Sequence, residues 1–270
     1  MKLLNGSELA YFIKNRQASE VRNLISQYNV VPKLAIVVTI DNTVIDLYVK
    51  LKRKYGSDLG IEVEIYRLNL SKVSTLIKTL NSDNKVHGII VQLPISDISK
   101  TDEIVNLVSP VKDVDALGLK SIYDPATPKA ILWLLAGYNI NLNDKKILLI
   151  GKGKLVGQPL EKMLLASEVN VTTIDKEILD IKTLSKTADI IITATGQPRL
   201  ITPDMIKDKA IVVDAGVSSE AGQMVGDLDE KVYERTDLTI TPSKGGIGPL
   251  TVCALFDNLI IATRNQVTKK

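Results

Sequence analysis

Tyr48 and Lys52 stand four positions apart in a segment with a helical pattern, and both carry groups that could take part in acid–base chemistry. This spacing places the two side chains on one face of a helix, so they could share a pocket. A lysine enclosed in such a pocket loses proton affinity, which would let its amine exchange protons near neutral pH. Read from these residues alone, a solvated basic face is the favoured alternative, because Lys50, Arg53 and Lys54 are neighbours.

A run of glycines near the middle of the chain could bind a phosphate. Gly151, Gly153 and Gly157 follow the apolar run 146–150, and Asp175 stands about twenty residues further on. A strand that ends in a tight glycine turn and feeds a helix aims several backbone N–H groups at one point, where a pyrophosphate can be held. The carboxylate is of the type that accepts a hydrogen bond from a ribose 2′-OH. These residues predict a dinucleotide site, and the first half of the chain must then supply the substrate site.

The charges around this turn leave the choice of dinucleotide open. Asp175 alone favours NAD, because its carboxylate repels the 2′-phosphate that distinguishes NADP. Lys152, Lys154 and Lys176 surround the same corner and could neutralise that phosphate as point charges. Both cofactors are therefore compatible with the residues themselves.

Another polar side chain stands where a predicted strand of the first half ends. Gln92 precedes Leu93 and Pro94, and the proline stops the hydrogen-bonded ladder, which exposes the amide at the carboxyl edge of the sheet. Ligands of open α/β sheets bind at that edge. Asp113 and Asp115 follow the last predicted helix of this half, where they could act on a ligand or serve loop solubility and capping.

The composition excludes several kinds of site. The chain of 270 residues has one histidine, His87, and one cysteine, Cys253, so neither a cysteine–histidine zinc cluster nor an internal disulfide can form. We expect no bound metal, and we interpret His87 as a structural residue and Cys253 as a packing residue. A net charge of +3 and 4% aromatic residues give no reason to expect nucleic acid as a partner.

The cellular location is also an expectation from the sequence. A single cysteine fits a reducing compartment. The N-terminal residues lack the apolar segment of a secretory signal, and no apolar run is judged long enough to cross a bilayer. We therefore expect a cytoplasmic protein that does not associate with membranes.

Helical and strand patterns alternate along the whole chain, which predicts parallel sheets covered by helices. In the first half, the predicted helices cover residues 7–28, 42–59, 72–82 and 100–108, and the predicted strands cover residues 34–40, 61–68 and 87–93. In the second half, helices are predicted near residues 127–138 and 251–265, and strands at residues 146–150, 170–173, 189–193, 210–214 and 238–241. The expected fold class is α/β, with an N-terminal parallel α/β substrate domain and a C-terminal doubly wound Rossmann-type nucleotide domain.

Five motifs occur in a fixed order along the chain. They are Tyr48-x3-Lys52, VHGIIVQLP at residues 86–94, KDVD at 112–115, ATGQP at 194–198 and GGIGPLT at 245–251. Taken together they resemble the bifunctional methylenetetrahydrofolate dehydrogenase/cyclohydrolase family, the FolD type, over essentially the whole chain. The resemblance implies an enzyme that oxidises 5,10-methylenetetrahydrofolate with a nicotinamide cofactor and hydrolyses the methenyl product to 10-formyltetrahydrofolate.

The same resemblance implies roles for particular residues. Lys52 matches the catalytic lysine that handles protons during water addition, Tyr48 the residue that packs against the folate, and Gln92 the amide that positions the lysine. Asp115 matches the carboxylate that fixes the pterin ring. The remaining implied substrate-binding residues are Leu93, Pro94, Gly246, Gly248 and Pro249. The implied cofactor-binding residues are Gly151, Lys152, Gly153, Val156, Gly157, Asp175, Lys176, Thr195, Gly196 and Val217.

The resemblance also implies an architecture. Residues 1–118 with 248–270 would form the folate-binding domain and residues 119–247 the nucleotide domain, with the active site in the cleft and a homodimer as the assembly. The nucleotide loop departs from the family, because Lys152-Gly153 and Asp175-Lys176 replace its usual Arg-Ser and His-Ser. We expect NADP, the family's commoner cofactor, with NAD as the alternative.

Two other functions remain as alternatives. A shikimate-dehydrogenase-like oxidoreductase shares the order of a substrate half before a nucleotide half. A non-catalytic dinucleotide sensor would use the first half to contact another protein. Tyr48, Lys52, Gln92 and Asp115 occur together, which argues against a sensor, since a sensor needs no proton chemistry.

Overall fold

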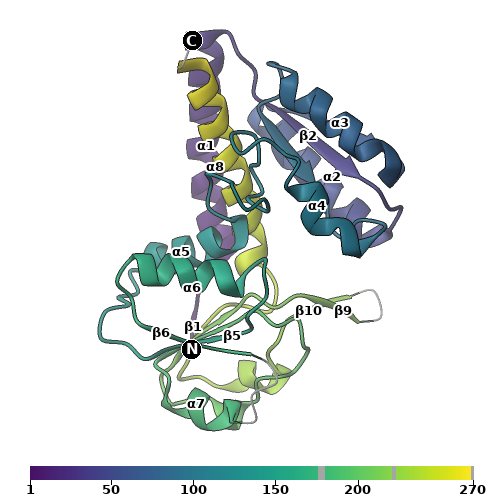
Figure 1. The fold of residues 1–270 in the computed structure, drawn as a ribbon. Coiled ribbons are helices and arrows are strands. Elements are labelled where there is room, and N and C mark those ends of the chain that lie inside the picture. The colour runs from purple at the N-terminus through teal and green to yellow at the C-terminus, as the bar shows by residue number, and fades with distance from the viewer. Residues whose placement is uncertain (176–179, 221–222, 269–270) are drawn as a thin grey trace. The chain divides into compact units, whose positions relative to one another are not determined.

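The computed structural model describes residues 1–175, 180–220 and 223–268, and its elements fall into two compact units. Phe12–Ala126 with Val252–Lys270 holds a three-stranded sheet, and we name it the three-stranded unit. Met1–Tyr11 with Thr127–Thr251 holds a six-stranded sheet, and we name it the six-stranded unit. Figure 1 labels the α-helices and some of the strands of both units.

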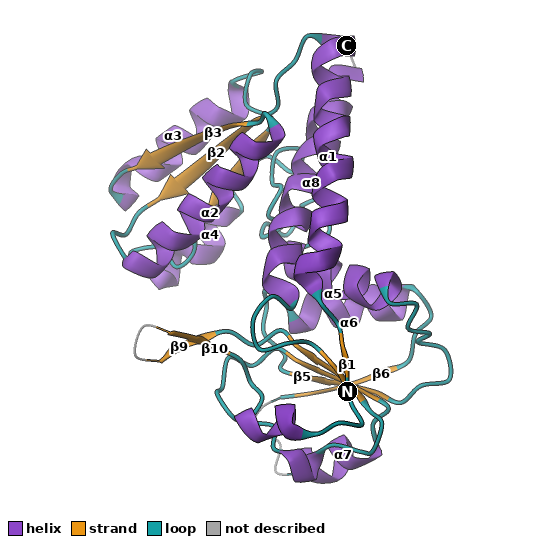
Figure 2. Cartoon of the chain, turned by 180° about the vertical axis from the view of Figure 1, so that it is seen from behind, coloured by secondary structure: helices purple, strands orange, loops and turns teal. Residues whose placement is uncertain are grey.

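The sheet of the three-stranded unit is parallel, with the order β3-β2-β4 (Figure 2). Its strands are β2 (Lys33–Val38), β3 (Glu62–Arg67) and β4 (Gly88–Val91). Its helical elements are α2 (Thr43–Leu59), α3 (Leu70–Ser82), η1 (Ile98–Lys100) and α4 (Thr101–Val105), with most of α1 (Gly6–Tyr28) and α8 (Ile247–Thr268). Strands β2 and β4 are almost entirely buried apolar runs, because helices cover both of their faces.

The two faces of this sheet pack against different helices. One face, with α3 and α4, forms a buried cluster of Ala35, Val37, Val73, Ile77, Leu80, Val86, Ile89, Val91, Ile95, Ile104, Val105 and Val108. On the other face, a Cβ atom at Gly88 of β4 would lie 2.7 Å from a methyl of Leu259 in α8. A Cβ at Gly56 of α2 would lie 3.1 Å from the Phe256 ring. Glycine at these two positions therefore lets α8 pack closely against β4 and α2.

The six-stranded unit contains a parallel sheet with the order β1-β11-β8-β7-β5-β6. Its strands are β1 (Lys2–Leu3), β5 (Ile147–Ile150), β6 (Val171–Ile174), β7 (Ile190–Thr193), β8 (Ile211–Asp214) and β11 (Thr239–Ile240). Its helical elements are α5 (Ala126–Gly137), α6 (Gly157–Ala166), α7 (Ile181–Thr187), η2 (Pro203–Met205) and η3 (Glu230–Glu234). The strand order reverses beside β5, which is where doubly wound sheets bind ligands.

Helices cover both faces of this second sheet, with α5 and α6 on one side and α7 on the other (Figure 1). The face toward α7 forms a buried cluster that includes Leu148, Ile150, Ile191, Val212, Leu228, Val232 and Ile240. A short antiparallel hairpin, β9 (Ser218–Glu220) and β10 (Gln223–Val225), stands apart from the main sheet.

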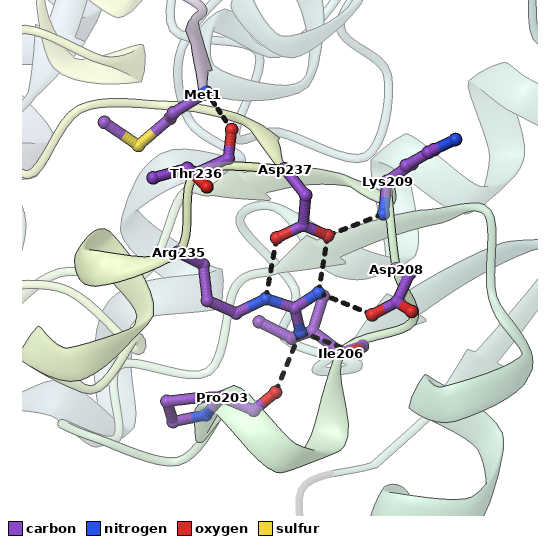
Figure 3. A network of polar contacts seen from close by, with 8 residues as sticks. All are labelled: Met1, Pro203, Ile206, Asp208, Lys209, Arg235, Thr236 and Asp237. Atoms are coloured by element: carbon purple, nitrogen blue, oxygen red, sulfur yellow. Dashed lines mark hydrogen bonds and ion pairs between the residues drawn. The ribbon is translucent and has the colours of Figure 1, made fainter.

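The amino edge of the six-stranded sheet is held by Arg235 (Figure 3). Its guanidinium donates to the carbonyl oxygens of Pro203 and Ile206 at 3.0 and 2.7 Å, and it forms ion pairs with Asp208 and Asp237 at 3.1 and 2.6 Å. One side chain thereby ties η2 to the start of β11. The network lies at the opposite end of the strands from the glycine turn, so it positions the sheet without entering the candidate site.

The expected α/β class and the alternation of elements are confirmed, but the expected domain boundaries differ from the compact units. Residues 1–11 were expected in the substrate domain, whereas β1 pairs with β11 of the six-stranded sheet. The second boundary falls at Thr127 rather than 119 and the third after Thr251 rather than 247. The α4 region is also shorter than the expected helix 100–108.

Helix α8 corrects a further expectation, that no apolar run could span a bilayer. By length and composition alone, Ile247–Thr268 is long and apolar enough, and 61% of its most apolar window is buried inside the structure. Its Phe256 ring lies 5.0 Å from the Tyr55 ring of α2, centroid to centroid, and Leu259 faces Gly88. These contacts are those of a core helix, whose apolar faces pack on its neighbours.

Candidate active site

Helix α2 carries Tyr48 and Lys52, and its own pattern explains their different surroundings. The side chain of Asn42 caps the helix by accepting from the N–H groups of Val44 and Ile45, at 2.8 and 3.4 Å. The buried residues of α2 are Ile45, Val49, Gly56 and Leu59. Lys52 falls within this series at helical spacing, so its stem lies on the buried face, while the Tyr48 ring stays 36% exposed at the margin.

The basic-face interpretation is therefore wrong for Lys52. Its neighbours Lys50, Arg53 and Lys54 are all exposed, as that interpretation expected, but Lys52 points inward. Its ammonium donates to Gln92 Oε1 at 2.8 Å. Burial lowers the pKa of Lys52, and the carboxylate of Asp115 partly opposes that shift.

Gln92 is held where β4 ends. Its backbone N–H donates to Val37 O of the neighbouring strand at 2.9 Å, and its side-chain amide donates to Leu93 O at 3.0 Å. The second bond fixes which end of the amide faces Lys52, so the oxygen points toward the ammonium. The Leu93–Pro94 peptide bond is cis, and Pro94 is exposed just beyond the strand.

The segment that carries Asp115 is anchored from two sides. Lys112 is buried, and its ammonium donates to Leu80 O and Asp83 O, at 2.9 and 2.7 Å, where α3 ends. Its own carbonyl accepts from the N–H of Ile89 in β4 at 2.7 Å. From α8, the side chain of Asn258 donates to Val114 O at 2.9 Å. These bonds fix the backbone before Asp113 and between the two aspartates.

The two aspartates of this segment face different partners. Asp113 accepts from the N–H of Gly118 at 2.8 Å and of Leu117 at 3.4 Å, so it caps the following loop. Burial is the main cause that raises the pKa of Asp113 to about 6. Burial also raises the pKa of Asp115, and Lys52 opposes that shift. The capping alternative therefore holds for Asp113, while Asp115 lies in the electrostatic reach of Lys52.

The six-stranded unit holds the predicted glycine turn at the carboxyl end of β5. Gly151 has a φ of +110°, and a Cβ there would lie 2.6 Å from Ala194 O. A Cβ at Gly157 would lie 1.8 Å from Gly151 O, so α6 starts in direct contact with the turn. Gly153 faces open space, and Val156 gives the helix no side-chain cap. This close turn below an uncapped helix N-terminus has the form of a phosphate cradle.

The other expected cofactor residues surround this turn. Lys152, Lys154 and Asp175 are exposed, and Asp175 directly follows β6. Lys176 lies outside the described residues. Thr195 and Gly196 follow β7, and Gly196 adopts a φ of +66°. Val217 follows β8 and is 55% exposed, as a position that lines a ligand would be.

Three expected substrate residues belong to the six-stranded unit rather than to the unit of Lys52. Gly246, Gly248 and Pro249 lie at the start of α8, within the range that ends at Thr251. Gly246 packs against helix α1, because a Cβ at Gly6 would lie 1.8 Å from Gly246 O. Gly248 faces open space.

The two residues interpreted as structural have structural surroundings. His87 is buried, and its Nδ1 accepts from the N–H of Lys33 at 3.1 Å. Cys253 is fully buried beside Tyr55, whose hydroxyl lies 3.1 Å from the sulfur. A cavity of about 510 Å³ at the amino ends of β5 and β6 contains none of the candidate residues.

Sequence reasoning missed a pair of carboxylates beside the glycine turn. Asp214 ends β8 and Asp227 follows β10, and Asp227 is fully buried. The N–H of Thr195 donates to Asp227 Oδ2 at 2.8 Å. The only signal in the sequence was that each aspartate stands close to a glycine, at Gly216 and Gly226.

Comparison with known proteins places both units in one family. Residues 4–115 match the tetrahydrofolate dehydrogenase/cyclohydrolase catalytic domain, and residues 125–267 match the NAD(P)-binding domain of the same family. A Campylobacter jejuni relative, "Bifunctional protein FolD", is 35% identical over 282 residues, which cover 99% of this chain and all of the relative.

Solved structures agree with the sequence relatives. The Campylobacter jejuni bifunctional FolD crystal structure has a TM-score of 0.92 and 34% identity, covering 98% of this chain and 99% of the other. A Trypanosoma brucei FolD, complexed with NADP cofactor and an inhibitor, has a TM-score of 0.91 and 26% identity, covering 98% of each chain. A Thermus thermophilus shikimate dehydrogenase has a TM-score of 0.55 and 12% identity over 87% of this chain and 99% of the other, a likeness of fold alone.

Proposed function

Because this chain belongs to the tetrahydrofolate dehydrogenase/cyclohydrolase family, we propose that the Lys52 group of the three-stranded unit and the glycine turn of the six-stranded unit serve its two reactions. The enzyme oxidises 5,10-methylenetetrahydrofolate to 5,10-methenyltetrahydrofolate with NADP. It then hydrolyses the methenyl compound to 10-formyltetrahydrofolate. The bond between the buried Lys52 ammonium and Gln92 is the observation that carries the assignment of residues.

Lys52 supplies the proton transfer that hydrolysis needs. The methenyl carbon is already electrophilic, so the protein must orient water and remove its proton rather than activate the carbon with a metal. Lys52 suits this role, because burial lowers the pKa of its amine and so raises the fraction of free amine that can act as a base. Gln92 holds the amine in one orientation, and Asp115 prevents its pKa from falling further.

The other residues of this group hold the folate. Tyr48 packs its half-exposed ring against the substrate, and burial raises the pKa of its phenol, which therefore stays protonated. Asp115 accepts hydrogen bonds from the pterin ring, which presents N–H donors. Family resemblance assigns Leu93, Pro94, Gly246, Gly248 and Pro249 to substrate binding as well.

The glycine turn and the N-terminus of α6 hold the pyrophosphate of NADP, which when bound supplies the acceptor for the hydride. Gly151, Gly153, Val156 and Gly157 let the backbone approach the phosphates. Lys152, Lys154 and Lys176 would supply positive charge for the 2′-phosphate and offset the charge of Asp175. Thr195, Gly196 and Val217 line the rest of the dinucleotide site.

The proposal extends to the cellular context. We propose that the enzyme works in the cytoplasm as a homodimer, without a membrane or nucleic acid as partner. A single cysteine that is buried in the structure supports a reducing compartment. Sedimentation velocity of the purified protein measures the assembly, and a monomer at micromolar concentration would contradict the dimer.

Replacing Lys52 with methionine tests the proposed role of its amine. We expect the rate of methenyl hydrolysis to fall by about 10²- to 10⁴-fold, the usual contribution of a positioned acid–base group. The loss of the substrate's near-ultraviolet absorbance measures this rate. NADP binding should persist. Lys50→Met is the matched control, because Lys50 is an exposed lysine on the same helix. Unchanged hydrolysis in Lys52→Met would refute the role of the amine.

A further inference from the structure

Two aspartates of the six-stranded unit form an interlocked pair at the carboxyl edge of the sheet. A Cβ atom at Gly216, two residues after Asp214, would lie 2.0 Å from Asp227 Oδ1. A Cβ atom at Gly226, which precedes Asp227, would lie 2.0 Å from Asp214 Oδ2. Each carboxylate therefore occupies the space that a side chain on the other segment would need, and neither glycine can be replaced without displacing a carboxylate.

Asp214 binds the backbone of both segments. Its Oδ1 accepts from the N–H of Gly216 at 2.9 Å and of Asp227 at 3.2 Å, and from the hydroxyl of Thr193 at 3.2 Å. Its Oδ2 accepts from the N–H of Leu228 at 3.3 Å. One carboxylate thus joins the end of β7, the loop after β8 and the segment after β10.

Asp227 extends the same network toward the glycine turn. Its Oδ2 accepts from the N–H of Thr195 at 2.8 Å, in the loop after β7. The Thr195 methyl in turn packs on the turn itself, because a Cβ at Gly151 would lie 3.2 Å from it. Gly196 approaches the loop after β8, since a Cβ there would lie 3.2 Å from Val217 O. The pair is therefore connected to three of the segments assigned to the dinucleotide.

The pair contains more negative charge than its surroundings balance. In the described part of the chain, no lysine or arginine forms an ion pair with either carboxylate, and the groups that bind Asp227, those of Thr195, Gln197 and Thr193, are neutral. Burial and the neighbouring Asp227 raise the pKa of Asp214 to about 6, and burial raises that of Asp227. Tyr233 of η3 also faces Asp214, and its raised pKa keeps the phenol neutral. Two carboxylates at such close quarters resist full ionisation.

We propose that Asp214 and Asp227 share one proton and act as positioning residues, which hold the loops after β7 and β8 in the arrangement that receives NADP. This inference rests on the proposed function for the identity of the dinucleotide. The pair does not touch the reacting atoms. It acts through Thr195 and Gly216, whose backbone N–H groups it binds and which directly precede Gly196 and Val217.

The first test measures the loop in the free protein. Asp227→Ala removes the acceptor of the Thr195 N–H, whereas Asp227→Asn keeps an oxygen there and replaces the shared proton with an amide N–H. We expect hydrogen exchange of the Thr195 amide, measured by NMR, to become about tenfold faster in Asp227→Ala. It should stay within about twofold of the unaltered protein in Asp227→Asn. Equal exchange rates in all three proteins would overturn the proposal.

The second test measures NADP binding through the fluorescence of Trp133, the single tryptophan. We expect affinity to fall about tenfold or more in Asp227→Ala and to stay nearly unchanged in Asp227→Asn. Affinity of the unaltered protein should decline as pH rises through about 6 and the shared proton leaves, and Asp227→Asn should lack that decline. Asp229→Ala is the control, because Asp229 caps η3 two residues away by accepting from Lys231 N at 2.9 Å, and it should bind NADP normally.

Each remaining outcome decides the question. Normal NADP affinity in Asp227→Ala, or the same decline through about pH 6 in Asp227→Asn as in the unaltered protein, would overturn the proposal. If Asp227→Ala does not fold, the pH dependence of NADP affinity in Asp227→Asn tests the proposal by itself. An unaltered protein that fails to bind NADP would refute the proposed cofactor instead, and the exchange measurement, which needs no cofactor, would still test the pair.

Discussion

Gln92→Met should shift the pH dependence of methenyl hydrolysis, because it removes the oxygen that accepts from Lys52. The side chains of glutamine and methionine are similar in length, but the methionine sulfur is only a weak acceptor. Gln92 is 9% exposed, so water cannot readily replace the lost oxygen. The acceptor stabilises the ammonium more than the neutral amine, and its removal therefore lowers the pKa of Lys52 below the value that burial already imposes.

The size of the shift follows from the 2.8 Å bond. A hydrogen bond to a charged group contributes about 1.5–3 kcal/mol, and about 1.4 kcal/mol corresponds to one pKa unit. The pKa of Lys52 should therefore fall by about 1–2 units. Hydrolysis that needs the free amine rises with pH through this pKa, so the rising limb of the rate profile should move to lower pH by the same amount.

The assay is steady-state hydrolysis of methenyltetrahydrofolate across neutral pH, with the uncatalysed rate subtracted at each point. Gln17→Met is the matched control, because Gln17 is a fully buried glutamine of the same unit that donates to Cys253 O at 2.8 Å. It should reduce stability without moving the limb. A limb that stays in place in Gln92→Met would show that the rate does not report the Lys52 amine, and the proposed base would be wrong.

The remaining predictions concern charge. Asp175→Ser should raise NADP affinity by about threefold to tenfold, since an exposed like charge near 4 Å costs about 1 kcal/mol in water, and it should weaken NAD binding. Fluorescence titration with both dinucleotides measures the two affinities. Unchanged NADP affinity would place Asp175 away from the phosphate. Asp113, with its pKa raised from 3.8 to about 6, favours the folded state fully below pH 3.8 and loses that contribution as pH rises through 6. Between these pH values the free energy of unfolding of the unaltered protein should therefore decline by about 3 kcal/mol, and Asp113→Asn should lack this decline, as measured by urea titration. An equally steep decline in the variant would contradict the assigned pKa.

Much of the site could be predicted because the sequence marks where the strands end. An apolar run followed by Gln92-Leu93-Pro94 marks the end of a buried strand, and the structure places Gln92 one residue after β4. The orientation of Lys52 could also have been predicted from the sequence. Ile45, Val49 and Leu59 define the buried face, and Lys52 fits their helical spacing, whereas attention to its charged neighbours favours the opposite face.

Other features depend on partners that are distant in the chain. Strand β1 has two exposed residues and no pattern of its own, and only its pairing with β11 defines it as a strand. The interlock of Asp214 and Asp227 is likewise invisible in the sequence. Each aspartate is locally a loop residue, and its burial arises when the glycine of the other segment leaves room for it.

The KDVD segment explains why two aspartates so close in sequence can have different tasks. Two ionised carboxylates two residues apart repel each other, and the charge of Asp115 is one of the causes that raise the pKa of Asp113. The N–H groups of Leu117 and Gly118 bind the carboxyl of Asp113, and its raised pKa lets it take up a proton near pH 6, which relieves the repulsion. Asp115 is then the carboxylate whose charge acts on Lys52. In the three-stranded unit, the carboxyl of Asp113 binds the backbone and holds the loop, whereas the carboxylate of Asp115 acts on the Lys52 amine.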